Sequence, residues 1–136
     1  MAYFRGAGVE RDFVRAQHWW SLAFERGEHD AGYNLGILHR RGLGVPRDTA
    51  RCIELWLEAA TAGSGMAQNA MGTAFLNGEG VDYSPIDAYA WFRSAAERGV
   101  KVAAVNAELA LMRLDEAGQE MARARAEAVS ASLKRR

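Results

Sequence analysis

The strongest constraint on the fold is a 36-residue period that runs through most of the 136 residues of the chain. Its clearest marker is a Gly-x-Gly-Val tetrapeptide, which begins at Gly6, at Gly42 and again at Gly78. Three further series keep the same step: Gly27, Gly63 and Gly99; Trp20, Trp56 and Phe92; Ala23, Ala59 and Ala95. A fixed period of this length indicates a solenoid, in which each unit buries its apolar face only against its neighbours. Solenoids usually present extended binding surfaces, so the repeat favours binding over catalysis.

Each unit is predicted to contain two helices. Apolar residues in the stretch 31–41 recur at intervals of three and four, which indicates a helix with one buried stripe. This helix is expected to end at Gly42, because glycine takes the left-handed conformation without steric cost. Gly36 and Gly72 lie inside such first helices, where glycine costs about 1 kcal/mol relative to alanine. We therefore expect a neighbouring helix to approach closely at these two glycines.

The second helix of each unit is predicted to begin at a polar capping residue. Asp12, Asp48 and Ser84 occupy equivalent positions, and their side-chain oxygens can accept hydrogen bonds from free backbone N–H groups. In the first unit this predicts a turn at 6–9 and a second helix over 12–26. The expected fold class is all-α.

Composition argues against several classes of function. The 17 basic and 17 acidic residues give a formal net charge of zero, whereas nucleic-acid binding needs a surplus of lysine and arginine. The single cysteine, Cys52, excludes an internal disulfide and a cysteine-rich metal site. It aligns with Ala16 and Ala88, which predicts a small buried residue. No apolar run reaches the ~18–20 residues that cross a bilayer. Because the first residues also lack the layout of a secretory signal, we expect a cytoplasmic protein without a membrane partner, or a periplasmic one if the true start lies upstream.

No catalytic, metal or cofactor site is predicted. His18, His29 and His39 are separated by 11 and 10 residues, so no two of them share a helical turn. The Gly-x-Gly-Val loops lack the strand context and the lysine of a phosphate-binding loop. Neither Ser21 nor Ser94 has a neighbouring acid–base arrangement that would activate a nucleophile.

The pattern of these residues resembles the Sel1-like repeat, a branch of the tetratricopeptide-type helical repeats. The second unit carries it at Ala31, Leu35, Gly36, Gly42, Gly44, Val45, Asp48, Trp56, Ala59, Ala60 and Gly63. The third unit carries it at Ala67, Met71, Gly72, Gly78, Gly80, Val81, Ser84, Ala88, Phe92, Ala95, Ala96 and Gly99. The resemblance implies a right-handed superhelical solenoid of antiparallel helix pairs with a concave inner face. It also implies a non-enzymatic adaptor in protein complexes, with another protein as partner and no cofactor.

The chain is predicted to form a single solenoid domain with atypical ends. Its parts are a truncated first repeat (1–29), a second repeat (30–65), a third repeat (66–101), and a partial repeat with a C-terminal helix (102–136). The last helix is expected over about 116–134, with Asp115 at its start, and we interpret it as a terminal cap. A partner-binding arm is the alternative, and both interpretations suit its charged residues Arg123, Arg125, Glu127 and Lys134.

The resemblance also implies where a partner binds, because the first helix of each unit lines the concave face in such solenoids. The inward positions are Tyr33, Ile37, Arg40 and Arg41; Asn69, Thr73, Leu76 and Asn77; and Val105, Leu109, Met112 and Arg113. Asparagine side chains can hold a peptide backbone, and arginines can bind carboxylates with two hydrogen bonds. The alternatives are that these positions are ordinary exposed ones or that the final helix covers them.

A second hypothesis concerns the truncated N-terminal end. There an uncovered apolar stripe of Phe4, Val9, Phe13 and Trp20 predicts self-association into a homo-oligomer. Two rival roles stay open from the sequence. One is a regulatory subunit or sensor that binds a small ligand in the groove, and the other is a fragment of a longer protein with the same repeats.

Overall fold

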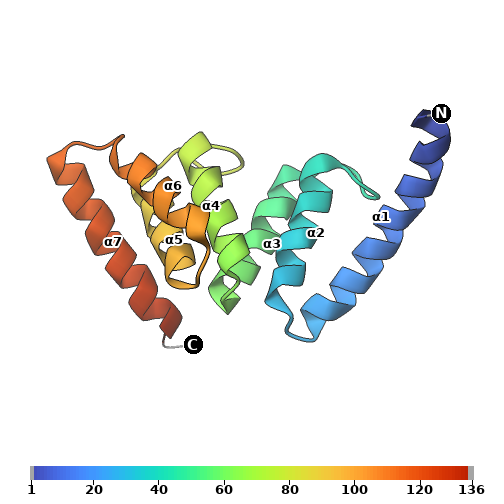
Figure 1. Ribbon diagram of the computed structural model, residues 1–136, viewed down its shortest axis with the longest axis horizontal. Coiled ribbons are helices and arrows are strands. Elements are labelled where there is room, and N and C mark those ends of the chain that lie inside the picture. Colours follow the sequence, from blue (N-terminus) through green and yellow to red (C-terminus); the bar gives the residue numbers. More distant parts are fainter. Residues whose placement is uncertain (1, 135–136) are drawn as a thin grey trace.

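The computed structural model describes the backbone of residues 2–134 and the side chains of residues 11–134. Its helices are α1 (Ala2–Glu25), α2 (His29–Arg41), α3 (Thr49–Ala62), α4 (Gly65–Asn77), α5 (Pro85–Glu97), α6 (Lys101–Leu111) and α7 (Glu116–Lys134). The described residues contain no β-strand. The helices follow one another in a row, with α1 at one end and α7 at the other (Figure 1). The predicted all-α solenoid is confirmed.

Two helix hairpins form the middle of the row. α2 packs against α3, α4 packs against α5, and the two hairpins meet where α3 packs against α4 (Figure 1). α2 also contacts α4, so the first helices of successive units share one side of the molecule. α6 packs against α5 and begins a further unit. Stacked in this way, each hairpin buries its apolar face against the next.

The turns inside the two hairpins follow the predicted chemistry. Gly42 and Gly78 end α2 and α4 in the left-handed conformation, with φ of 67° and 65°. The side chains of Asp48 and Ser84 each accept a hydrogen bond from a backbone N–H in the first turn of the second helix, at 3.0 Å and 3.1 Å. Pro85 stands in the first turn of α5, where proline is tolerated.

Gly36 and Gly72 let the second helix of each hairpin approach the first. A β-carbon at Gly36 would overlap the indole of Trp56, and one at Gly72 would overlap the ring of Phe92. Both aromatic side chains are buried. The predicted close approach is confirmed, and it explains why a residue of low helix propensity recurs there.

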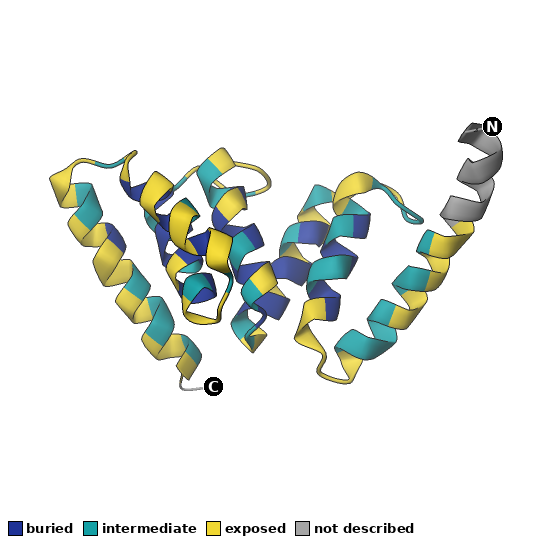
Figure 2. Cartoon of the chain, in the orientation of Figure 1, coloured by how far each residue is buried: buried dark blue, intermediate teal, exposed yellow. Residues whose placement is uncertain are grey.

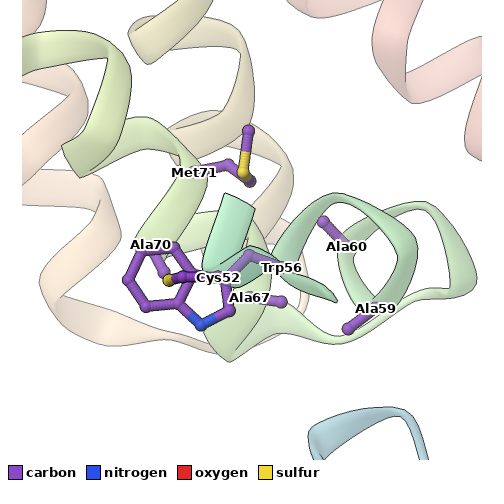
Figure 3. Close-up of a cluster of buried hydrophobic side chains, with 7 residues drawn as sticks. All are labelled: Cys52, Trp56, Ala59, Ala60, Ala67, Ala70 and Met71. Carbon is purple, nitrogen blue, oxygen red and sulfur yellow. The ribbon is translucent and has the colours of Figure 1, made fainter. Parts of the chain in front are cut away.

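A cluster of buried side chains joins α3 to α4 (Figure 3). Its members are Cys52, Trp56, Ala59, Ala60, Ala67, Ala70 and Met71. Cys52 is completely buried, as its alignment with two alanines predicts. Burial raises the pKa of the Cys52 thiol to about 12. The thiol therefore fills space in the interior as a small apolar group.

The N-terminal unit differs from the prediction. α1 is one helix over Ala2–Glu25, so the predicted turn at 6–9 and the predicted helix start at Asp12 are both wrong. In the next two units the equivalent turn rests on a preceding helix: Gly44 lies against α1, and Gly80 lies against α3. Among the described helices, none lies on the side of α1 that faces away from α2. The helix therefore continues, because each further residue adds a backbone hydrogen bond once a helix has formed.

α7 covers the C-terminal end of the interior. Its first turn is capped by Asp115, whose Oδ1 accepts a hydrogen bond from Gly118 N at 2.8 Å. Ala122 is buried in a cluster with Phe92 and Leu111. α7 packs mainly against α5 and makes few contacts with α6. α7 lies where the cap interpretation predicts, and it does not cover the side that α2 and α4 share.

Candidate functional site

A partly open hollow of ≈ 300 Å³ lies between α2 and α4. We call it the groove, and its lining residues are Tyr33, Ile37, Arg40, Arg41, Trp56, Met66, Asn69, Ala70, Thr73, Ala74 and Glu79. Six residues predicted for the concave face meet here: Tyr33, Ile37, Arg40, Arg41, Asn69 and Thr73. The structure thus brings together side chains from two successive units, and partner binding at this groove stays a prediction.

Trp56 and Tyr33 give the groove a fixed aromatic base. The indole Nε1 of Trp56 donates a hydrogen bond to the backbone oxygen of Tyr33 at 3.0 Å. The two rings are stacked, with centroids 6.0 Å apart and planes inclined by 23°. The buried alanines Ala70 and Ala74 add only methyl groups from α4, which leaves the hollow above them open. Because the indole is buried and its N–H is satisfied, a ligand would find this base already in place.

An ion pair between Arg40 and Glu79 closes one edge of the groove. Arg40 Nε donates to Glu79 Oε1 at 2.7 Å, and Arg40 Nη2 donates to Glu79 Oε2 at 3.4 Å. Its hydrogen bond to the Glu79 carboxylate raises the pKa of the Arg40 guanidinium above its ordinary value. Both side chains are more than two-fifths exposed, at 43% and 44%. The pair is therefore open to exchange with solvent or with a ligand.

The polar side of the groove is held by hydrogen bonds along and between helices. Thr73 Oγ1 donates to the backbone oxygen of Asn69 at 3.2 Å. Asn69 Oδ1 accepts a hydrogen bond from Asn106 Nδ2 of α6 at 3.2 Å. This second bond fixes the Asn69 side chain between two units.

The other predicted residues lie outside the groove. Leu76 is half-buried against the C-terminal part of the core. Its backbone oxygen accepts a hydrogen bond from Arg113 Nη1 at 3.3 Å, which ties the end of α6 to α4. Asn77 and Met112 are exposed at the ends of α4 and α6. Leu76, Asn77, Met112 and Arg113 therefore lie beyond the groove, on the side of the molecule that the first helices share.

α6 carries a row of exposed apolar side chains. Its members, spaced by three, four and three residues, are Val102, Val105, Leu109 and Met112, exposed by 55%, 60%, 49% and 77%. We call them the α6 row. The sequence placed three of them on the concave face and missed Val102.

Sequence reasoning also missed part of the groove. The repeat pattern does not indicate that the indole of Trp56 reaches the base of the groove. Met66, Ala70 and Ala74 follow one another at four-residue intervals, on a stripe of α4 beside the predicted Asn69 and Thr73. Glu79 stands in a turn, at a variable position of the repeat, where no pattern signals a role.

The predicted apolar stripe at the N-terminal end is only partly described. The side chains of Phe4 and Val9 lie outside the described residues. Phe13 and Trp20 are half-buried against a leucine cluster of α2 and α3, so only part of each side chain is exposed. On the described part of α1 the large exposed apolar side chains are Val14 and Trp19. Self-association stays a hypothesis.

The charged residues of α7 lie against or near α5. Arg125 forms an ion pair with Asp87 of α5. Arg123, Glu127 and Lys134 line a second hollow, of ≈ 500 Å³, between α5 and α7. These contacts suit the cap, and a further role of α7 as a binding arm stays a hypothesis.

The described residues contain no group of three or more histidine, cysteine or acidic side chains placed to hold a metal ion. Within this part of the chain no helix is long and apolar enough to span a membrane. His39 is half-buried, and desolvation lowers the pKa of its imidazole. The positive charge of Arg51 lowers this pKa further, while Asp48 acts in the opposite direction.

Comparison with known proteins agrees with this arrangement. The family model described as Sel1 repeat matches residues 1–28, 29–64 and 65–100. The comparison with curated proteins gives no match.

Solved structures share the fold. One is a protective antigen present in uropathogenic Escherichia coli strains, displaying an SLR fold. The match covers 98% of this chain and 30% of the antigen, with a TM-score of 0.83 and 24% sequence identity. Another is a Sel1 repeat protein from Oxalobacter formigenes. Here the match covers 78% of this chain and 42% of the other protein, with a TM-score of 0.68 and 26% sequence identity. This chain therefore spans less than half the length of either protein. With three matched repeats and the same helical solenoid, the chain belongs to the Sel1-repeat family, whose members typically mediate protein–protein interactions.

Proposed function

We propose that this protein is a non-enzymatic adaptor that binds a segment of another protein in the groove between α2 and α4. The observation that carries the proposal is the groove's construction. Tyr33 and Trp56 form a fixed aromatic base, while Arg40, Asn69 and Thr73 supply polar groups around it. A concave surface with a few placed polar groups and a preformed base is typical of binding sites.

The size and openness of the groove favour a protein segment over a small ligand. Small-molecule sites usually have about 300–1,000 Å³ and enclose most of their ligand. Here the hollow has ≈ 300 Å³ and is partly open. It can take one or two side chains of a segment that continues along the first-helix side towards α6.

A catalytic role has little support from the groove's chemistry. Its charged groups are two arginines and one carboxylate, and Arg40 already binds that carboxylate. General acid–base catalysis needs a group with a pKa near the working pH and free to exchange protons. The Sel1-repeat fold is also typically non-enzymatic.

Selection from a displayed library of random peptides about twelve residues long, on the full chain, tests the proposal. Thr73 is exposed on α4 and lines the groove, so Thr73→Arg fills the hollow without entering the core. Leu57→Arg is the matched control, because Leu57 is exposed on α3 and does not line the groove. We expect selected peptides to bind wild type and Leu57→Arg equally and to lose Thr73→Arg. Peptides that bind all three proteins equally would place the binding site elsewhere.

A further inference from the structure

Glu79 holds a fixed position at the edge of the groove. It follows α4 in the turn between Gly78 and Gly80, which both have positive φ, 65° and 77°. The backbone N–H of Glu79 donates to Ala74 O at 2.9 Å. From there its carboxylate accepts the two hydrogen bonds from Arg40 of the preceding hairpin. The Glu79 carboxylate is thus already bound to the Arg40 guanidinium, with which a carboxylate of a bound segment would otherwise pair.

The repeat does not require this ion pair. One period before Glu79 stands Leu43, which packs against the leucine cluster of α2 and α3. One period after Arg40 stands Leu76, which packs against the core. Both members of the pair therefore replace residues that contribute to packing in the sister unit. An exposed ion pair adds little to stability, so an external carboxylate can take the place of Glu79 at small cost.

The α6 row continues the same side of the molecule. Met112 stands two periods after Arg40, and Leu76 lies midway between them in the sequence. Two hydrogen bonds hold α6 beside α4: Asn106 to Asn69, and Arg113 to the backbone oxygen of Leu76. Figure 2 shows much of α6 exposed, and α7 lies against α5 instead. Exposed apolar side chains gathered on one face are typical of association surfaces.

Charge and apolar surface together point to one kind of occupant. The groove is lined by two arginines, Arg40 and Arg41, and by the single carboxylate of Glu79. Arg113 adds a further positive charge beside Met112 at the end of α6. Arginine can bind a carboxylate with two parallel hydrogen bonds, whereas lysine binds it as a point charge. The positive groove and the α6 row therefore complement a segment that is acidic at one end and apolar at the other.

We infer that the partner segment carries an acidic side chain that displaces Glu79 from Arg40, and apolar side chains that cover Leu109 and Met112. The inference rests on the proposed function. The partner is then a peptide segment whose acidic residue binds at α2 and whose apolar residues lie further along the segment, at α6.

The test uses the peptide that the selection described above enriches most on the wild-type chain. It is synthesised with a fluorescent label and used as the probe in anisotropy titrations. Glu79→Gln removes the internal competitor, and we expect the probe to bind about two- to five-fold tighter. Glu54→Gln is the matched control, because Glu54 pairs with Arg51 at 3.3 Å on α3, away from the groove. It should leave the affinity unchanged. With Arg40→Gln, the probe and its acid-to-amide analogue should bind equally.

The apolar contact has its own control. Leu109→Asn should weaken the probe about three- to ten-fold, since the segment would bury the exposed half of the leucine side chain. Leu57→Asn, at an exposed leucine outside the groove, should have no effect. Circular dichroism of each variant verifies that it is folded.

The outcomes separate the inference from the function on which it rests. Groove-dependent peptides without an acidic residue, or an unchanged affinity for Glu79→Gln, would overturn the inference and leave the adaptor role standing. Peptides insensitive to Thr73→Arg, or no selected peptide at all, would overturn both. Probe binding that depends on Glu79, Arg40 and Leu109 as described would support both.

Discussion

The indole Nε1 of Trp56 donates a hydrogen bond to the backbone oxygen of Tyr33 at 3.0 Å, and the Tyr33 ring stacks on the same indole. One tryptophan of the repeat therefore serves two purposes. It closes the hairpin of α2 and α3 in the core, and it forms the base of the groove. The base of the groove is therefore part of the core.

Replacing this tryptophan should lower stability measurably. Trp56→Phe removes the indole hydrogen bond and part of the buried ring, although Phe92 shows that phenylalanine fits the equivalent position. We expect a loss of about 1–3 kcal/mol in the free energy of unfolding, measured by urea denaturation. Trp19→Phe, at a side chain that is 65% exposed, should change it by less than about 0.5 kcal/mol. Equal losses in both variants would contradict the role given to Trp56.

Gly72 should not tolerate alanine, despite its position inside a helix. Alanine favours an exposed helix by about 1 kcal/mol over glycine. At Gly72, however, the added β-carbon meets the ring of Phe92 at 2.5 Å. Overpacking of this kind costs about 1–3 kcal/mol, so Gly72→Ala should lower the melting temperature. Thr73→Ala, at the next and exposed position, serves as the control and should change it little. A raised melting temperature for Gly72→Ala would contradict the close helix approach.

Stability should fall as the pH drops because of His39. Desolvation lowers the pKa of His39 in the folded protein, so the unfolded chain takes up this proton at a higher pH than the folded one. The loss therefore begins near the ordinary histidine pKa of about 6.5 and grows until the pH passes below the folded value. His39→Phe, which copies Phe75 of the next unit, should reduce the difference in unfolding free energy between pH 7.5 and pH 5.5. An identical pH dependence in wild type and variant would exclude this contribution.

Cys52 should be unreactive in the folded protein. With a pKa of about 12, its thiol is ionised in only about one molecule in ten thousand at pH 8. Alkylation by iodoacetamide, followed by mass spectrometry, should be very slow under native conditions and rapid in urea. Cys52→Ala, which copies Ala88, should stay folded. Rapid native labelling would show that the cluster around Cys52 opens readily.

Local chemistry made much of the fold predictable from the sequence. Gly42 and Gly78 end helices, and Asp48 and Ser84 start them, through contacts within a few residues. The turn predicted at the Gly6 tetrapeptide was wrong because such a turn also depends on contacts distant in the sequence. Its sister turns depend on packing against a preceding helix, and the described part of the chain provides none there.

The groove was predictable only in part, for a similar reason. The repeat put Tyr33, Arg40 and Asn69 on one face, because equivalent positions of successive helices lie side by side. It could not reveal that Glu79 reaches back to Arg40. That contact joins a variable turn position to the preceding unit, across 39 residues of sequence.

Binding at the groove is tested most directly by the affinity of one groove-selected peptide for wild type, Thr73→Arg and Leu57→Arg, measured by fluorescence anisotropy. We expect unchanged affinity for Leu57→Arg. For Thr73→Arg, whose side chain fills the hollow, we expect a loss of at least about ten-fold. Equal binding to all three folded proteins would contradict the claim that the space between α2 and α4 receives the partner.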